Sequence, residues 1–260
     1  MTRRGEERAG SLRRLAGLLR RVLRLRGRPR DDSTAADPGP PRGLVIGIGG
    51  VGGLDFCGPA LRHVLAESGL PYALRIFPWG HGFGRWYADL SRVADRDAKA
   101  ALLADTVRKF RADRPGEPVF LVAKSGGTAV AVRAMELLPR DSVETAILLA
   151  PALSPGYDLT SALDAVAREM VVFWSPLDLI ILGAGTALFG TADRVRGASA
   201  GLVGFRSPSA GPYPRLRQVR WTPGMASTGN LGGHVGPDSP VFLRKYIVPL
   251  LRPAPAADSC

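Results

Sequence analysis

Residues 120–128 read Phe-Leu-Val-Ala-Lys-Ser-Gly-Gly-Thr, and this stretch decides the fold that we predict. An apolar run followed by small-x-Ser-x-small, from Ala123 to Gly127, is typical of a buried strand that turns sharply into a helix. The turn is so tight that the residues two positions from the serine must be small, and it holds the Ser125 hydroxyl above the strand end, beside the helix N-terminus. The alternative is a serine that caps an ordinary crossover helix. Ser125 is therefore our candidate nucleophile.

Short apolar runs alternate with amphipathic segments on both sides of this turn. We predict strands at residues 44–48, 72–77, 119–122, 144–150, 170–174 and 216–221. We predict helices at residues 54–68, 92–110, 127–137, 159–167 and 241–251. This alternation predicts an α/β fold with a mostly parallel central sheet flanked by helices on both faces. In such sheets, reactive groups gather at the carboxyl ends of the strands.

The residues that follow Ser125 include candidates for a base and an acid. When a nucleophile sits on this kind of turn, the chain order is nucleophile, acid, histidine. Of the three histidines, only His234 follows Ser125 in the sequence, and it lies in a glycine-rich loop after the last predicted strand. Asp178 ends Val-Val-Phe-Trp-Ser-Pro-Leu-Asp, a buried strand followed by a short loop, and its carboxylate would orient His234. Asp158 is the alternative candidate for the acid. An alternative role for Asp178 is to cap the segment that follows it.

An acyl-transfer site also needs N–H donors for the developing oxyanion. We expect one from the amide of Gly126 and the second from the loop Gly49-Gly-Val-Gly-Gly53, where Gly50 and Val51 are the candidates. The same region also satisfies G-x-G-x-x-G from Gly47 to Gly52, the dinucleotide fingerprint. The acid which that fingerprint requires at the end of the next strand is missing. We therefore predict no cofactor.

Several residues are candidates for the substrate pocket. Lys124 would place a cation beside the nucleophile, and Trp79 and His81 follow the second predicted strand. Trp86 and Phe83 are further aromatic candidates. Residues 183–205 are small and apolar, and are candidates for a lid or an acyl-binding wall.

Charge and cysteine content limit the other function classes. The 260-residue chain has a net charge of +12 and 45% apolar residues. Eleven Arg and two Glu in residues 1–30 account for +9 of that charge, so the other 230 residues carry a net charge of only +3. We therefore predict no specific nucleic-acid partner. The two cysteines, Cys57 and Cys260, are not a pair suited to a structural disulfide, and no Cys/His cluster has metal-ligand spacing, so we predict no metal.

The N-terminal arm, residues 1–26, has its own character. Between Ser11 and Arg26 the leucines share one helical face and the arginines the other, which suits an anionic membrane surface. The alternative is a poorly ordered, solvated leader. Arginines interrupt every candidate core of a secretory signal, and no run of about 18 apolar residues predicts a spanning helix. We expect a cytoplasmic protein, peripheral at the inner membrane face if residues 11–26 bind there.

Composition also sets the predicted boundaries. Residues 27–42 are rich in Pro, Gly, Asp and Ser and are predicted to be a linker, which starts the main domain at residue 43. That domain is predicted to end at residue 252, and residues 253–260 to form a loose tail.

Taken together, the turn at Ser125, the glycine-rich loop, Asp178 and His234 resemble the α/β-hydrolase superfamily over residues 42–251. The similarity is to uncharacterised bacterial members of esterase or lipase type, whose turn is normally Gly-His-Ser-Gly-Gly; this sequence has Ala123 and Lys124 instead, and Thr128 in place of a third glycine. The resemblance implies a serine hydrolase that forms an acyl-enzyme from a carboxylic ester. The apolar segment 183–205, the aromatic candidates and the amphipathic arm favour a lipid-like or hydrophobic ester. The alternatives are a non-catalytic binding protein, disabled by Lys124, and a membrane-surface interaction protein.

Overall fold

The computed structural model describes residues 41–53, 57–82, 84–208 and 211–252. The predicted arm, nearly all of the linker and the predicted tail lie outside the described residues, as does Phe83. Among the residues described, no helix is long and apolar enough to cross a lipid bilayer.

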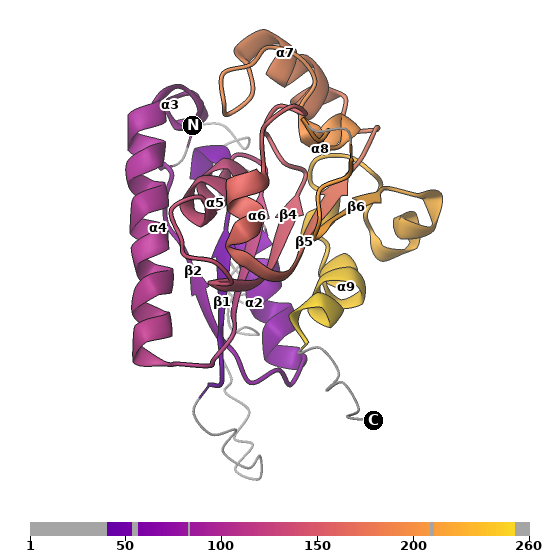
Figure 1. Ribbon diagram of the computed structural model, residues 1–260. Coiled ribbons are helices and arrows are strands. Elements are labelled where there is room, and N and C mark those ends of the chain that lie inside the picture. Colours follow the sequence, from indigo (N-terminus) through magenta and orange to yellow (C-terminus); the bar gives the residue numbers. More distant parts are fainter. Residues whose placement is uncertain (1–40, 54–56, 83, 209–210, 253–260) are drawn as a thin grey trace, which may run out of the picture. The chain divides into compact units, whose positions relative to one another are not determined.

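A six-stranded sheet forms the centre of the fold (Figure 1). Its strands are β1 (Leu44–Ile48), β2 (Ala73–Ile76), β3 (Val119–Lys124), β4 (Val143–Leu149), β5 (Val166–Trp174) and β6 (Leu216–Arg220). The spatial order is β2-β1-β3-β4-β5-β6, and every neighbouring pair is parallel. The central strands β1 and β3 are buried along their whole length, as expected for a sheet covered on both faces. The predicted α/β class is confirmed.

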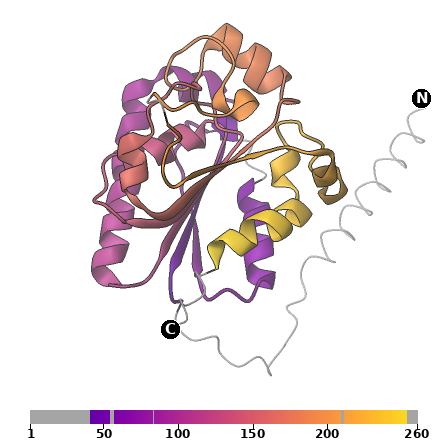
Figure 2. The same ribbon diagram turned by 45° about the vertical axis from the view of Figure 1, so that its right-hand side comes forward.

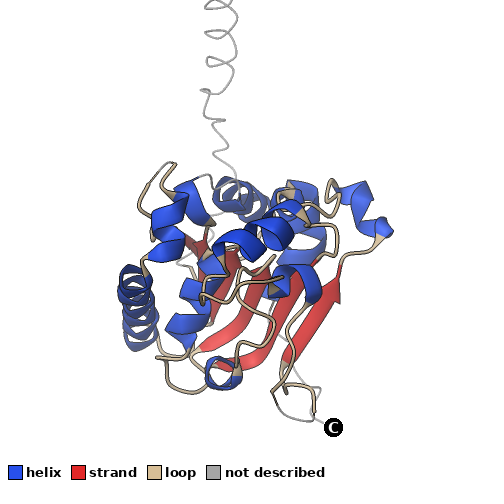
Figure 3. Ribbon diagram, turned by 90° about the horizontal axis from the view of Figure 1, so that it is seen from above, coloured by secondary structure: helices blue, strands red, loops and turns tan. Residues whose placement is uncertain are grey.

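Helices cover both faces of the sheet (Figures 2 and 3). On one face, α4 (Val93–Asp113), α5 (Gly127–Met135) and α6 (Thr160–Asp164) pack on alternate strand residues such as Ile46 and Leu121. On the other face, α2 (Cys57–Glu67) and the helical segment 240–251, which begins with α9 (Pro240–Phe242), pack on the intervening residues such as Val45 and Phe120. The shorter helices are α3 (Trp86–Ser91), α7 (Thr186–Phe189) and α8 (Ala200–Val203).

The order of the strands reverses between β1 and β3. From β1 the chain runs outward to β2, then returns to place β3 on the other side of β1. The loops that leave such neighbouring strands diverge to opposite faces and open a crevice at their carboxyl ends. The glycine-rich loop after β1 and Ser125 after β3 meet at this point.

Two predicted elements differ from those observed. The helix predicted at residues 92–110 is observed as α4 and extends to Asp113, and a further helix that was not predicted, α3, precedes it, with Arg92 between them in a non-helical conformation. The helix predicted at residues 159–167 ends at Asp164, and β5 already begins at Val166. The first residues of β5 pair with β4 only, because β6 joins the ladder at Met170. This part of β5 is therefore half-exposed and carries polar residues, which hid its strand character.

Candidate active site

Ser125 lies at the sharp turn between β3 and α5. Its φ of 52° is in the left-handed region, which a side chain other than glycine rarely adopts. The Ser125 N–H donates to the carbonyl of Leu149, 2.9 Å away, and the Ser125 carbonyl accepts from the amide and the hydroxyl of Thr128. These bonds to β4 and α5 hold the strained turn in place. Thr128 thus contributes to the turn.

The two glycines after Ser125 are required by close packing with the loop after β1. A Cβ at Gly127 would lie 2.1 Å from the carbonyl oxygen of Gly49, and one at Gly126 would lie 2.4 Å from a Val51 methyl group. Neither distance is sterically possible for a side chain. The small residues predicted from the tightness of the turn are therefore needed because the glycine-rich loop rests directly upon it.

His234 connects Ser125 to a carboxylate. Its Nε2 lies 3.0 Å from the Ser125 Oγ, and its Nδ1 lies 2.6 Å from Asp178 Oδ2. Because the Asp178 carboxylate accepts a hydrogen bond from Nδ1–H, Nε2 is left as the acceptor for the serine hydroxyl. Asp178 is almost completely buried, at 3% exposure. Three residues from the loops after β3, β5 and β6 thus form one hydrogen-bonded series.

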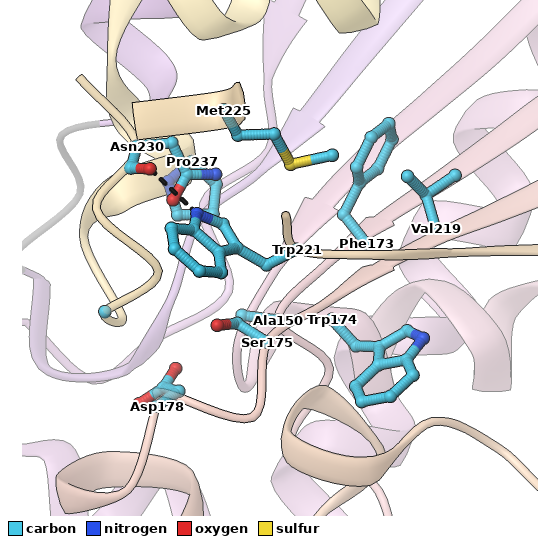
Figure 4. A pocket seen from close by; sticks show the side chains of 11 residues that line it. Ala150, Phe173, Trp174, Ser175, Asp178, Val219, Trp221, Met225, Asn230 and Pro237 are labelled. Carbon is cyan, nitrogen blue, oxygen red and sulfur yellow. Dashed lines mark hydrogen bonds between the residues drawn. The ribbon is translucent and has the colours of Figure 1, made fainter. Parts of the chain in front are cut away.

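The loop that carries His234 is held in place by Trp221, which lies in a cluster with Phe173 and Trp174 (Figure 4). The indole N–H of Trp221 donates to the carbonyl of Asn230 over 2.8 Å, and the Asn230 side-chain oxygen accepts from the Gly232 amide over 3.0 Å. Trp221 and Asn230 share a small cavity with Asp178 and with Phe173 of β5. This packing sets the distance from the His234 loop to the acid.

The rival acid, Asp158, has a different role. It is exposed, and its carboxylate accepts hydrogen bonds from the hydroxyl and amide of Thr160, which lower its pKa, and from the Tyr213 hydroxyl. It therefore bonds to Thr160 at the start of α6. Of the two acids considered from the sequence, only Asp178 bonds to His234.

The oxyanion candidates lie around the serine. The position of a Cβ at Gly50 is 3.4 Å from the Ser125 Cβ and 3.8 Å from its Oγ. The loop is held on either side of Gly50 and Val51: the Trp79 indole N–H donates to the carbonyl of Gly49 over 2.8 Å. On the far side, the amide of Gly52 donates to buried Asp89 over 2.7 Å. The backbone of Gly50 and Val51 is thus fixed beside Ser125.

Lys124 does not place its cation beside the nucleophile. Its ammonium forms an ion pair with Asp238, and both side chains are only 7% exposed. Asp238 follows His234 by four residues, so the pair joins the end of β3 to the far end of the His234 loop. The prediction of Lys124 as a pocket residue is corrected: its side chain is used in an internal contact. Sequence analysis had missed Asp238.

His81 also bonds internally. Its Nδ1 lies 2.8 Å from Asp89 and its Nε2 lies 2.9 Å from Asp95. The hydrogen bond to Asp95, and then that to Asp89, raise the pKa of His81. Since Asp89 also binds the Gly52 amide, His81 supports the glycine-rich loop through a shared carboxylate. Nothing in the local sequence marked Asp89, because its partners are 8 and 37 residues away.

An apolar cavity of about 370 Å³ opens beside Ser125. Its lining residues are Val51, Trp86, Ser125, Gly126, Ala152, Ile181, Leu182, Gly185, Thr186, Phe189 and Gly190. Trp79, Lys124 and His81, predicted as pocket residues, are absent from this lining, and each is bonded within the protein. Much of the wall comes from residues 177–190, here termed the cap segment, which includes α7 at the top of Figure 1. Of the wall predicted at 183–205, only Gly185, Thr186, Phe189 and Gly190 line the cavity.

A metal site was not expected. Among the residues described, no cluster of three or more His, Cys, Asp or Glu side chains has the arrangement to hold a metal ion.

Comparison with known proteins gives one family match. Residues 79–189, less than half of the chain, match the family model for serine aminopeptidases, S33. The matched segment includes Ser125 and Asp178 and ends before His234. No curated protein matches the chain.

Several solved structures resemble this chain. The crystal structure of esterase PE8 has 18% identity and a TM-score of 0.46, covering 81% of this chain and 95% of its own. A protein of Xanthomonas campestris pv. campestris, described as belonging to the α/β superfamily of hydrolases, has 19% identity and a TM-score of 0.39, with 76% and 94% coverage. An uncharacterised protein from Capnocytophaga ochracea has 10% identity and a TM-score of 0.42, with 80% and 56% coverage.

The fold and the site agree with the family match. The sheet is all-parallel, its strand order reverses between β1 and β3, and a serine with a strained backbone follows β3 within the matched segment. The chain thus has a six-stranded parallel α/β fold and, over residues 79–189, is similar to the serine aminopeptidases, S33.

Proposed function

We propose that this protein is a serine hydrolase that cleaves carboxylic esters with a hydrophobic acyl group. Ser125 is the nucleophile, His234 the general base and Asp178 the residue that orients His234. The observation that carries the proposal is the series of two hydrogen bonds, 2.6 Å from Asp178 to His234 and 3.0 Å from His234 to Ser125. Both distances are within reach for proton transfer and for fixing the imidazole tautomer.

The reaction proceeds in two balanced steps. As the Ser125 Oγ bonds to the ester carbonyl carbon, its proton passes to His234 Nε2. The C–O bond to the alcohol then breaks, and the alcohol leaves with that proton. Water next gives a proton to His234 and attacks the acyl carbon, and the bond to Ser125 breaks as the proton returns to Oγ. The products are a carboxylic acid and an alcohol, and the enzyme is restored.

Backbone amides would stabilise the oxyanion in both steps. The amide of Gly126 begins the turn into α5, and Gly50 and Val51 lie on the facing loop. Trp79 and Asp89 hold that loop before the substrate arrives. Donors that are fixed in advance need no reorganisation when charge develops, and each such donor typically contributes about 3–4 kcal/mol to transition-state stabilisation.

The cavity supports an ester with an apolar acyl group. Its lining is almost entirely apolar, and none of the described residues that form it carries a charge. An aminopeptidase would have to bind the charged amino group of its substrate near the scissile bond, which would need a buried partner of opposite charge. The lining of this cavity therefore favours an ester over a peptide with a free N-terminus.

The position of Lys124 bears on the alternative of a non-catalytic binding protein. A cation beside Ser125 would be the reason for loss of activity. The Lys124 ammonium is instead paired with Asp238, and the hydrogen-bonded series at Ser125 is intact. These contacts support an active site over a disabled one.

Labelling by a fluorophosphonate probe tests the proposal, because such probes react only with an activated serine. We expect labelling of the wild type and none of Ser125→Ala or His234→Ala. Ser227→Ala and His63→Ala are matched controls: Ser227 is exposed, and His63 is exposed and paired with Glu67, so both variants should label fully. A folded wild-type protein that does not label would refute the proposal and favour a binding role.

A panel of esters that differ only in acyl length tests the substrate class. Burial of each methylene contributes about 0.8 kcal/mol, so kcat/KM should rise up to about fourfold per methylene until the cavity is filled. Rates that do not depend on acyl length would contradict an acyl-binding cavity while leaving the serine chemistry intact.

A further inference from the structure

Large apolar side chains are exposed around the opening of the cavity beside Ser125. Ile180 is 80% exposed and Leu188 is 66% exposed. Within the cap segment the exposed apolar residues are Leu177, Leu179, Ile180, Ile181, Leu188 and Phe189. Such residues are normal singly, but many of them together on one surface indicate an interaction site.

The exposed side chains form a connected surface, here termed the apolar rim. Phe189 of the cap segment packs edge-on against Trp86, with ring centroids 5.1 Å apart, and Trp86 packs against Tyr87 at 5.8 Å. On the opposite side, Leu177 touches Gly232, whose Cβ position is 2.8 Å from a Leu177 methyl carbon. Gly232 follows Leu231, an exposed residue of the His234 loop. The rim thus extends from α3 across the cap segment to the histidine loop.

The rim and the cavity are continuous. Trp86, Ile181 and Phe189 are exposed at the surface and also line the cavity that reaches Ser125. A molecule seated on the rim therefore lies at the entrance to the acyl-binding wall. A folded protein seated there would cover this entrance, whereas a lipid layer would cover the rim and also supply apolar chains to the cavity.

The charges at the rim fit an anionic layer. The only charged residue between positions 177 and 189 is Asp178, which is buried against His234. Exposed arginines follow directly at the edges: Arg85 precedes Trp86, and Arg194 and Arg196 follow α7. Arg194 adjoins the cavity wall, since its Cα is 3.8 Å from the Cβ position of Gly190. An apolar surface bordered by arginines matches an acyl layer beneath anionic headgroups.

We propose that the apolar rim docks on an anionic lipid surface and that an acyl chain of that surface enters the cavity directly. The entry of the chain rests on the proposed hydrolase function, whereas the docking does not. The rim consists of other residues than the arm at 11–26, for which the sequence also predicted binding to an anionic membrane.

Vesicle binding by the full-length protein tests the docking. We would measure sedimentation with vesicles of phosphatidylcholine and phosphatidylglycerol, using Ser125→Ala as the background so that no turnover occurs. Adding Ile180→Asp and Leu188→Asp should lower the partition coefficient by about tenfold or more, because these two side chains leave the apolar layer. The matched control is Leu102→Asp, an exposed leucine on α4 outside the rim, which should bind as the background does.

Each outcome decides the proposal. Unchanged binding by the double variant would assign docking to the arm or another face and overturn the proposal, as would failure of the parent protein to bind vesicles. A concentration-dependent dimer that the double variant abolishes, without vesicle binding, would assign the rim to a second copy of the chain.

Hydrolysis distinguishes this proposal from the proposed function. With Ser125 intact, Ile180→Asp/Leu188→Asp should hydrolyse a soluble short-chain ester at the wild-type rate, because neither residue lines the cavity. It should lose about tenfold or more of its rate on a long-chain ester embedded in vesicles. Vesicle binding that depends on the rim, in a protein that hydrolyses neither ester, would leave docking intact and refute the hydrolase.

Discussion

Replacing Lys124 by Met would remove one half of a buried ion pair while keeping most of the apolar volume of the side chain. Both Lys124 and Asp238 are 7% exposed, so the variant leaves a carboxylate in the interior without the ammonium that faced it. Breaking a buried pair in this way costs about 3–5 kcal/mol. For a domain of this size each kcal/mol lowers Tm by about 2–4 °C, so we expect a drop of about 6–20 °C.

Urea unfolding at neutral pH measures this cost against two comparisons. Lys109→Met breaks an exposed pair with Asp113, whose side chains are 78% and 57% exposed, and should cost no more than about 1 kcal/mol. Lys124→Met combined with Asp238→Asn removes both charges and should recover much of the loss. Asp238→Asn alone is measured as well, so that the double variant can be compared with the sum of the two single losses. A loss below about 1 kcal/mol for Lys124→Met, or a double variant that loses as much stability as that sum, would refute the buried pair.

Three further variants test other parts of the site. Gly127→Ala should destabilise the fold by about 3 kcal/mol, because its Cβ meets a carbonyl at 2.1 Å, whereas Gly156→Ala, with no atom within 4 Å, should be neutral in thermal unfolding. Asp178→Asn should lower kcat about 10⁴-fold through the wrong imidazole tautomer, and Asp158→Asn should match the wild type. His81 has a pKa raised above its ordinary 6.5, so its contribution to stability is complete below pH 6.5 and is lost as the pH rises through the raised value. The free energy of unfolding of His81→Gln should therefore fall less than that of the wild type between about pH 6 and 9. A variant with the same pH profile as the wild type would argue against the two carboxylate bonds.

Local sequence patterns were sufficient to predict most of the sheet and the sharp turn at Ser125. The strands β1, β3 and β4 are short buried runs, whose apolar residues need no knowledge of their neighbours to be recognised. The turn at Ser125 requires small residues at fixed spacing, so it too is visible in the sequence. The start of β5 at Val166 was missed because its strand character depends on where β6 joins the sheet.

Contacts between distant segments were decided by the tertiary structure alone. The sequence placed Asp158 and Asp178 after neighbouring strands, and only the path of the His234 loop selects Asp178. Lys124 was likewise predicted to place its cation in the site. Its ion pair with Asp238, 114 residues further along the chain, could not be read from the sequence, because it forms only where β3 packs against the histidine loop.

The sequence by itself therefore determined the strands, the serine turn and the candidates for base and acid, because each depends on residue type and short-range spacing. The tertiary structure decided which carboxylate meets the histidine and which polar side chains are used in internal bonds. It also decided which apolar residues form the cavity and which remain at its rim. Those outcomes depend on desolvation and packing between segments far apart in the chain, and no local pattern carries that information.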